Sequence, residues 1–494
     1  MTDMLLSALS SLFRVEVLLA VLGGTTGGMI IGAIPGLTAT MAVALLIPVT
    51  FGMDPVVGLA MMGGVYSGGM YGGAISSILL STPGTPAAAA TAFDGYPMTR
   101  QGKGGTAIAI ATVASFWGGI VSTFALLMVA PVLAKFALRF GPPEYFLLAI
   151  LGLASIVTLT SGNLVKGMLS GILGLVIASI GMDPIDGYIR FSGGFIELFE
   201  GVSFMPALIG LFSISQILDL TAESHIVQTL GADPDSLKRA SIPKGLGGTI
   251  ARGSFIGTVV GILPGAGATI AAFISYNLAK QVSTDPDSFG KGNPEGVAAA
   301  ESANNGCVGG SLVPLLTLGI PGNSVAAALM GGLMIQGLIP GPELFTRFGT
   351  VTYAFILSLF LANLCFLFLG LYGAPFFARV ATVPNSLLIP MISVLSVIGS
   401  YAINNSLFDV WLMLAFGVGG YFLHRAGFSL GAVVLGLILG PIAEMGFGQS
   451  LIMSQGSAAI FFDRPICLIL WGLVALLLLP VIFRRRKAVK FLGR

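Results

Sequence analysis

Four Pro-Gly pairs interrupt apolar stretches of this sequence, and small residues with hydroxyl or amide groups follow them. Proline lacks a backbone donor and clashes with the preceding helical turn, so each pair predicts a helix break. The run after each break would begin a half-helix, whose first N–H groups lack partners and attract anions. We therefore predict an anion-binding site built by Gly36, Thr38, Thr40, Pro83, Gly84, Thr85, Gly265, Ala266, Gly267, Thr269, Pro321, Gly322, Asn323 and Ser324.

A carboxyl group and two amides lie close together in the second half of the chain, at Glu301, Asn304 and Asn305. With the backbone carbonyls freed at the Pro83 and Pro321 breaks, they predict a cation site. Hard oxygen ligands of this kind suit Na⁺, whereas H⁺ would need a titratable group. A position of Glu301 at a helix end near the membrane interface is the other interpretation. No further metal site is predicted.

The breaks belong to an internal repeat. Four glycines spaced every four residues recur at one constant offset, Gly24, Gly28, Gly32 and Gly36 as Gly253, Gly257, Gly261 and Gly265. The second break recurs at a slightly larger offset, because the second copy has a longer polar loop. Glycines at this spacing share one helix face and let another backbone approach closely in a bilayer. Helix packing is therefore the other interpretation of each ridge glycine.

Composition indicates a membrane protein. The chain has 55% hydrophobic and only 9% charged residues, with a mean hydropathy of +0.96, whereas a soluble domain carries about 25% charged residues. We predict an all-α polytopic membrane protein with about 11–13 spans, including broken helices and re-entrant hairpins. A net charge of +2 spread over loops indicates no nucleic-acid partner. The three cysteines lack the spacing of a disulfide framework or zinc site.

Four regions follow from the motifs and the charges. Residues 1–218 are the first half with its broken helices, 219–252 a polar inter-repeat loop, 253–350 the second set of transport motifs and 351–494 a C-terminal scaffold. Four Lys and Arg residues in the loop predict that it is cytoplasmic. The basic run at residues 484–487 predicts the same for the C-terminus, or a contact with membrane lipid.

Paired breaks at matching places in two halves are typical of transporters with a midplane site. An odd number of crossings between the halves would make them inverted repeats, and an even number would make them parallel. We predict inversion. The small Ala, Gly and Thr surfaces near the breaks would let this unit slide against the Leu- and Phe-rich spans after Val351, in an elevator-like movement.

Other polar residues lack such a pattern. His225 and His424 are isolated in the sequence, and we interpret them as loop or core histidines without a ligand role. Asp183, Glu197 and Glu200 are interpreted as solvated side chains near one membrane boundary.

Several motifs resemble those of the large membrane subunit of tripartite tricarboxylate transporters, the TctA-like proteins. They span essentially the whole chain: GAIPGLTATMAVALLIP, YGGAISSILLSTPGTP, FDGYPMTRQGKGG, GILPGAGATIAAFISY, FGKGNPEGVAAAESANN and PLLTLGIPGNSVAAALMGGLMIQGLIPGPELF. The resemblance implies a bacterial inner-membrane carrier that works with a small four-span membrane subunit and a periplasmic solute-binding protein. Such a carrier moves carboxylates on an ion gradient. This chain departs from the family pattern at Ser81, where Asn is common, and at Thr85, where Glu is common.

These observations together predict secondary uptake of a tricarboxylate, a dicarboxylate or a related organic acid, coupled to Na⁺ or H⁺ and without a cofactor. An anion channel would also need a polar path, but two sets of broken hairpins favour an occluded site. A carrier for another small solute is the further alternative. An enzyme is not indicated, because the sequence has no HExxH motif and no close pair of membrane aspartates. The sequence leaves the substrate open.

Overall fold

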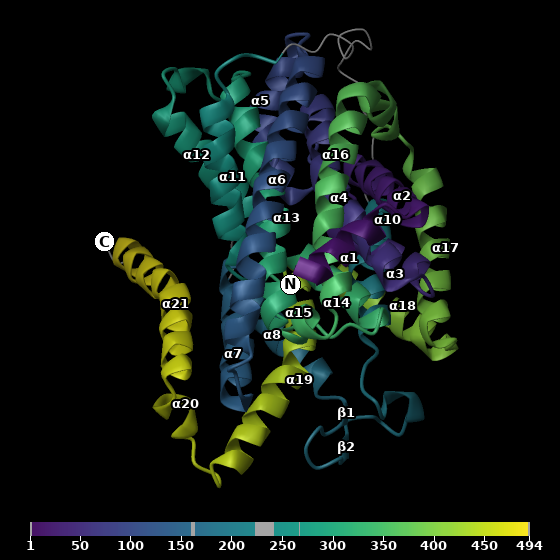
Figure 1. The fold of residues 1–494 in the computed structure, drawn as a ribbon, viewed down its shortest axis with the longest axis vertical. Helices are drawn as coiled ribbons and strands as arrows, with labels where there is room; N and C mark the ends of the chain where they lie inside the picture. Colours follow the sequence, from purple (N-terminus) through teal and green to yellow (C-terminus); the bar gives the residue numbers. More distant parts are fainter. Residues whose placement is uncertain (1, 160–163, 223–241, 266, 493–494) are drawn as a thin grey trace.

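The computed structural model describes residues 2–159, 164–222, 242–265 and 267–492 (Figure 1). Its first half contains α1 (Thr2–Leu12), α2 (Val15–Ala33), α3 (Ala39–Thr50), α4 (Pro55–Leu80), η1 (Pro86–Ala88), α5 (Ala89–Arg100), α6 (Gly104–Ala137), α7 (Pro142–Leu159), α8 (Leu164–Ala178), β1 (Gly181–Met182), β2 (Ile189–Arg190), η2 (Ile196–Leu198), α9 (Phe204–Ile209), the π-helix η3 (Gly210–Ile214) and α10 (Ser215–Ala222). Its second half contains α11 (Gly247–Ile262), α12 (Gly267–Val282), η5 (Pro286–Ser288), α13 (Pro294–Leu318), α14 (Ser324–Ile335), α15 (Glu343–Thr346), α16 (Gly349–Val380), α17 (Asn385–Asn404), α18 (Leu407–Arg425), α19 (Leu430–Met453), α20 (Ile460–Asp463) and α21 (Pro465–Leu492).

Helix length and polarity fit a membrane. Within the described ranges, seven helical segments are long and apolar enough to cross a bilayer: α2, α6, the continuous segment 204–222, α16, α17, α18 and α19. The glycine-rich α4 and α13 have 26 and 25 residues, enough for about 38 Å of helix. Several shorter apolar helices lie among them. The prediction of an all-α polytopic membrane protein is confirmed.

The chain leaves its helices at all four Pro-Gly pairs. Gly36 has φ +86° between α2 and α3, and Gly265 has φ +78° between α11 and α12. α4 ends at Ser81 with φ 57°, and α13 ends at Gly319 with φ 71°. These two residues occupy matching positions of the repeat, so both halves end their long central helix with one left-handed residue.

The glycine ridges hold pairs of helices in close contact. A Cβ added to the α2 ridge would overlap carbonyl oxygens of α4 at successive turns, Gly24 with Met61, Gly28 with Val65 and Gly32 with Gly69. In the second half α11 approaches α13 in the same way, with Gly257 against Ala303 and Gly261 against Cys307. Ridge glycines thus serve helix packing, which was the simpler interpretation of them.

The long central helices of the two halves run in opposite directions. Tyr66 Oη and Ser311 Oγ are 2.8 Å apart. Asn304, earlier on α13, donates from Nδ2 to the carbonyl of Met70, later on α4, at 3.2 Å. α4 and α13 are therefore antiparallel. α6 lies alongside α13 and α16 alongside α4, each parallel to that neighbour, in the centre of the molecule (Figure 1).

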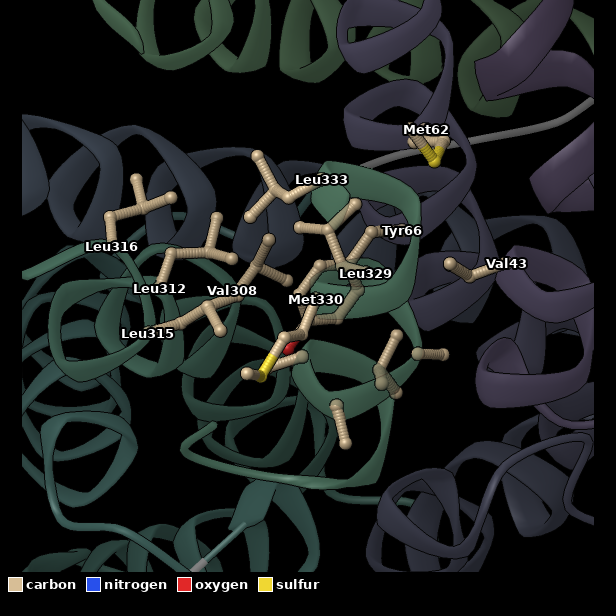
Figure 2. Close-up of a cluster of buried hydrophobic side chains, with 14 of the residues drawn as sticks. Val43, Met62, Tyr66, Val308, Leu312, Leu315, Leu316, Leu329, Met330 and Leu333 are labelled. Atoms are coloured by element: carbon tan, nitrogen blue, oxygen red, sulfur yellow. The ribbon is translucent and has the colours of Figure 1, made fainter. Parts of the chain in front are cut away.

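Apolar side chains from both halves hold α14 in place. Figure 2 shows this packing, in which α14 lies among α3, α4 and α13. The labelled side chains are Leu329, Met330 and Leu333 of α14, Val308, Leu312, Leu315 and Leu316 of α13, Met62 and Tyr66 of α4, and Val43 of α3. This core fixes the position at which α14 begins.

The inter-repeat region is shorter than the polar stretch 219–252 suggests. α10 continues to Ala222, and α11 already begins at Gly247. His225, Lys238 and Arg239 lie outside the described residues. α21 stands to one side of the helix bundle, beyond α19 and α20 (Figure 1).

Candidate functional site

A cavity of about 500 Å³ lies where the four half-helices begin. The beginnings of α3, η1, α12 and α14 line one part of its wall, and α10, the end of α18 and the beginning of α19 line another. Its described lining is Thr38, Ala39, Thr40, Met70, Thr85, Pro86, Ala87, Leu211, Phe212, Ser215, Gln216, Asp219, Gly267, Ala268, Thr269, Ile270, Asn323, Ser324, Val325, His424, Phe428, Ser429 and Leu430. Four breaks that are far apart in the sequence therefore meet at one space.

The lining follows the internal repeat. Residues 38–40 line the cavity, and so do residues 267–269 at the offset of the first break. Residues 85–87 line it as well, together with residues 323–325 at the offset of the second break. Each half thus contributes the same two short segments, so the cavity lies where the two copies of the repeat meet.

Two of the predicted site residues use their side chains to cap a helix. Thr38 Oγ1 accepts from the backbone N–H of Met41 at 3.2 Å. Asn323 Oδ1 accepts from the N–H of Ala326 at 2.8 Å, and its Nδ2 donates to Tyr66 Oη at 2.8 Å. Because these groups already have partners, Thr38 and Asn323 position the half-helices and offer few free atoms to a ligand.

Other hydroxyl groups remain available. Thr40 Oγ1 and Ser324 Oγ lie 3.1 Å apart and join the beginnings of α3 and α14 across the two halves. Thr85 is only 3% exposed, and its Oγ1 has no partner among the described residues. A buried hydroxyl without a partner costs free energy. Thr85 lines the cavity with Thr269, and its buried hydroxyl without a described partner is a candidate ligand group.

The Pro-Gly pairs themselves do not line the cavity. Gly36 and Gly265 make the turns, and Gly265 donates its N–H to the carbonyl of Gly322 at 2.9 Å. Added Cβ atoms at Gly84 and Gly322 would meet backbone atoms of neighbouring helices. Pro83 and Pro321 are likewise absent from the described lining, and Ala266 lies outside the described residues. In this structure the pairs shape the breaks, and direct ligand contact at them stays a prediction.

Glu301 is fully buried on α13 and is surrounded by neutral donors. Thr91 Oγ1 donates to its Oε1, Ser115 Oγ donates to Oε2 at 2.9 Å, and Asn304 Nδ2 reaches Oε2 at 3.4 Å. No basic side chain of the described residues forms an ion pair with it. The interfacial interpretation of Glu301 is therefore wrong. A buried carboxylate without a positive partner is unfavourable, so this position calls for a proton or a bound cation.

The amides beside Glu301 have unused oxygen atoms. Asn304 and Asn305 are both 0% exposed. Asn304 Oδ1 and both side-chain atoms of Asn305 lack partners among the described residues. None of the three residues lines the cavity, but Asn304 bonds to the carbonyl of Met70, which does. The predicted cation residues thus form a polar group directly behind the cavity wall.

The chain matches the description "Tripartite tricarboxylate transporter TctA family" over residues 18–435. It belongs to the TctA family. An uncharacterised 52.8 kDa protein in the TAR-I ttuC′ 3′ region of Agrobacterium vitis is 37% identical over 477 residues, or 94% of both chains. An uncharacterised protein in the TAR-II ttuC′ 3′ region is 39% identical over 237 residues, covering 47% of this chain and 98% of the relative. No solved structure matches the chain.

Membership confirms the resemblance seen in the motifs. This TctA-family chain is the large membrane subunit of a tripartite tricarboxylate transporter, which works with other subunits. Its family and its apolar helices make it a multi-pass membrane transport protein. The family points to transport and away from enzymatic catalysis.

Sequence reasoning missed the part of the TctA cavity that comes from outside the hairpins. Asp219 of α10 and His424 of α18 both line it, and Nδ1 of His424 is 2.9 Å from Asp219 Oδ2. The interpretation of His424 as isolated is therefore wrong, because its partner is about 200 residues away in the chain. A signal existed in η3 and α10, where Leu211, Phe212, Ser215, Gln216 and Asp219 follow a helical period.

A second cavity, of about 590 Å³, lies at the other end of α14. Met330 and Met334 line it, whereas Ser324 at the beginning of α14 lines the first cavity. Its carboxylates are Glu200, Glu343 and Glu444, and Arg190 binds Glu444 through two hydrogen bonds of 2.6 and 3.0 Å. Of the acidic residues predicted to be solvated, Glu200 thus borders a cavity, whereas Glu197 does not.

Proposed function

We propose that this protein carries an organic carboxylate through the cavity at the four half-helix beginnings, coupled to a cation held near Glu301. The observation that carries the proposal is the meeting of matched segments from both halves, residues 38–40 and 85–87 with 267–269 and 323–325, around one space. A tricarboxylate, a dicarboxylate or a related organic acid fits the chemistry, and the family description favours the first.

Half-helix beginnings suit a ligand that must be released again. Backbone N–H groups and the hydroxyls of Thr40, Thr85, Thr269 and Ser324 can hold a carboxylate. The described lining contains no Arg or Lys. An arginine clamp would form stronger, charge-assisted bonds and would also cost more to desolvate. Moderate binding of this kind fits a carrier.

The coupling ion would occupy the polar group behind the cavity. Na⁺ could be held by Glu301 with the free oxygens of Asn304 and Asn305. H⁺ would instead reside on Glu301 itself. Either ion would satisfy the buried carboxylate, and Asn304 connects this group to Met70 in the cavity wall. Ion and substrate can therefore influence each other over a short path.

We further infer that the halves are inverted repeats that move in an elevator-like manner. Antiparallel α4 and α13 with equivalent breaks support inversion. The cavity lies between the half-helices and the ends of α10 and α18, so movement of one group against the other would change its access. The polar loop after α10 and the basic C-terminal run would be cytoplasmic in a bacterial inner membrane. The partners would be a four-span subunit and a periplasmic solute-binding protein.

The carrier proposal is tested in proteoliposomes that contain the chain with the two other subunits of its transporter. Uptake of labelled citrate and succinate should saturate and should collapse when the Na⁺ and H⁺ gradients are removed. Ser324→Ala combined with Thr85→Val should reduce uptake about tenfold or more, since two ligand hydroxyls are lost. A flux that does not saturate with substrate concentration and does not depend on either ion gradient would favour the anion channel.

The inversion is tested by single cysteines in a background without Cys307, Cys365 and Cys467. Glu16→Cys marks the beginning of α2, and Asp287→Cys marks the loop between α12 and α13. A membrane-impermeant thiol reagent should label the first in intact spheroplasts and the second only in inside-out vesicles. Labelling of both positions from one face would contradict the inverted arrangement.

A further inference from the structure

An ion pair forms part of the cavity wall opposite the half-helices. Asp219 Oδ2 accepts from Nδ1 of His424 at 2.9 Å, and Asp219 Oδ1 lies 3.3 Å from Nε of Arg425. Asp219 and His424 line the cavity, whereas Arg425 does not and stacks on Tyr421 with 5.3 Å between its guanidinium carbon and the ring centre. The group joins α10 to the end of α18.

His424 is the one described lining residue that can become positively charged near neutral pH. Asp219 and Arg425 balance each other, so a neutral His424 leaves the group without net charge. A proton on His424 gives the group a charge of +1. The cavity therefore acquires a positive charge at its α18 side only when this imidazole is protonated.

The contact with Asp219 fixes which imidazole nitrogen of His424 can bind a ligand. Because Asp219 engages Nδ1, Nε2 is the nitrogen left to bond with a molecule in the cavity. The His424 side chain is 58% exposed, whereas that of Asp219 is 12% exposed. Asp219 is thus fixed in the protein, and the imidazole is accessible. In the protonated ring Nε2 donates, so it would bind an anionic oxygen.

The helix that carries Asp219 has a local distortion at the cavity. The π-helix η3 runs from Gly210 to Ile214, directly before α10. Turns of this kind occur frequently at functional sites, because the extra residue redirects the side chains that follow. Five residues from this segment line the cavity: Leu211, Phe212, Ser215, Gln216 and Asp219.

We propose that His424, held by Asp219, binds a second carboxylate of the substrate and makes the cavity select di- and tricarboxylates over monocarboxylates. This inference rests on the proposed carboxylate function. One carboxylate binds at the half-helix beginnings, near Thr40 and Ser324, and the second accepts a hydrogen bond from Nε2. A monocarboxylate of similar size leaves the charged imidazole without an anionic partner.

Selection of this kind depends on pH. The charged groups near His424 are Asp219 of α10, Arg425 at the end of α18 and Lys166 of α8. Lys166 of α8 donates to the carbonyl of Ala426 at 2.7 Å, close to the end of α18. Because only a protonated imidazole carries the positive charge, polycarboxylate binding is stronger at acidic pH than at alkaline pH.

The test is calorimetric titration of the purified full-length protein in detergent with citrate, succinate and butyrate, from about pH 5.5 to about pH 8. His424→Gln should weaken citrate and succinate about tenfold at the acidic end, the effect of one charge-assisted hydrogen bond, and leave butyrate unchanged. His424→Arg should keep the preference for polycarboxylates and abolish its pH dependence. Asn404→Ala, which removes a 2.7 Å bond to Asp409 outside the cavity lining, is the matched control.

Two results would overturn the inference. Equal weakening of all three acids by His424→Gln and by His424→Arg would mean that the ion pair only connects α10 to α18. Unchanged citrate and succinate binding in His424→Gln, with both weakened in Thr85→Val, would exclude His424 and leave the carrier proposal intact. By contrast, unchanged binding of all three acids in the Thr85→Val and Ser324→Ala double variant would contradict the carrier site itself.

Discussion

The two halves of this TctA-family protein share a backbone design and differ in chemistry. On α13, Glu301, Asn304 and Asn305 form the buried polar group, whereas the matching positions of α4 are Gly63, Tyr66 and Ser67. Both helices are buried and break after a left-handed residue. The repeat therefore explains where the breaks and the cavity lie, but the proposed cation site belongs to the second half alone.

The half-helix beginnings differ in the same way. Asn323 caps α14, while Thr85 at the matching position forms no cap, and its hydroxyl has no described partner. Gly319 supplies the left-handed residue after α13, where the first half uses Ser81. The polar groups at the second break of the second half thus have more hydrogen-bond partners. The first half keeps the Thr85 hydroxyl without a described partner and a non-glycine residue, Ser81, at positive φ.

The largest effect is expected for Glu301→Gln, which removes the charge that the first half lacks. Ion-driven uptake should fall about 100-fold, because the cation loses its negative partner. Uptake is measured in proteoliposomes against Na⁺ concentration and against pH. Loss of Na⁺ dependence in Asn305→Ala would identify Na⁺, and loss of pH dependence in Glu301→Gln would identify H⁺. Ser67→Ala is the matched control on α4; a normal ion response in both second-half variants would contradict the asymmetry.

A second comparison concerns packing at the breaks. Gly84→Ala would place a Cβ against the carbonyl oxygen of Gly32, and Gly322→Ala would place one 2.8 Å from the Cα of Ser311. Overpacking of this kind costs about 1–3 kcal/mol. Thermal unfolding in detergent should show both variants destabilised, Gly84→Ala the more. Two variants as stable as the wild type would mean that the breaks are loosely packed.

Substitution of the two matched polar residues should separate binding from stability. Thr85→Val removes a hydroxyl without a described partner, so it should weaken substrate binding about tenfold with little effect on unfolding. Asn323→Ala removes a helix cap and should cost about 1 kcal/mol of stability. Calorimetric titration and thermal unfolding of both variants test this contrast. The reverse pattern would mean that Asn323 is the ligand and Thr85 the structural residue.

The smallest effect is expected at the left-handed residues. Ser81→Gly should stabilise the protein by about 1 kcal/mol, because a Cβ is unfavourable at φ 57°. Gly319→Ser should be destabilising by a similar amount at φ 71°. Thermal unfolding of each variant measures the difference. Destabilisation by Ser81→Gly would show that its side chain contributes more than the strain costs.

The sequence alone determined the membrane class, the repeat, the helix breaks and the family motifs. These properties depend on local chemistry. Hydropathy, the missing donor of proline and the φ freedom of glycine act within a few residues, so they can be recognised at Pro35-Gly36 or Pro321-Gly322 without any tertiary contact. The cluster of Glu301 with Asn304 and Asn305 was recognised for the same reason.

Only the tertiary structure decided which of these residues face the cavity. Thr38 and Asn323 were predicted as ligands, but their side chains cap α3 and α14. Glu301 is buried because Thr91 and Ser115, some 200 positions earlier, surround it. His424 acquires a role only through Asp219 on another helix. Contacts between distant parts of the chain depend on how whole helices pack, and no local pattern at either partner records that packing.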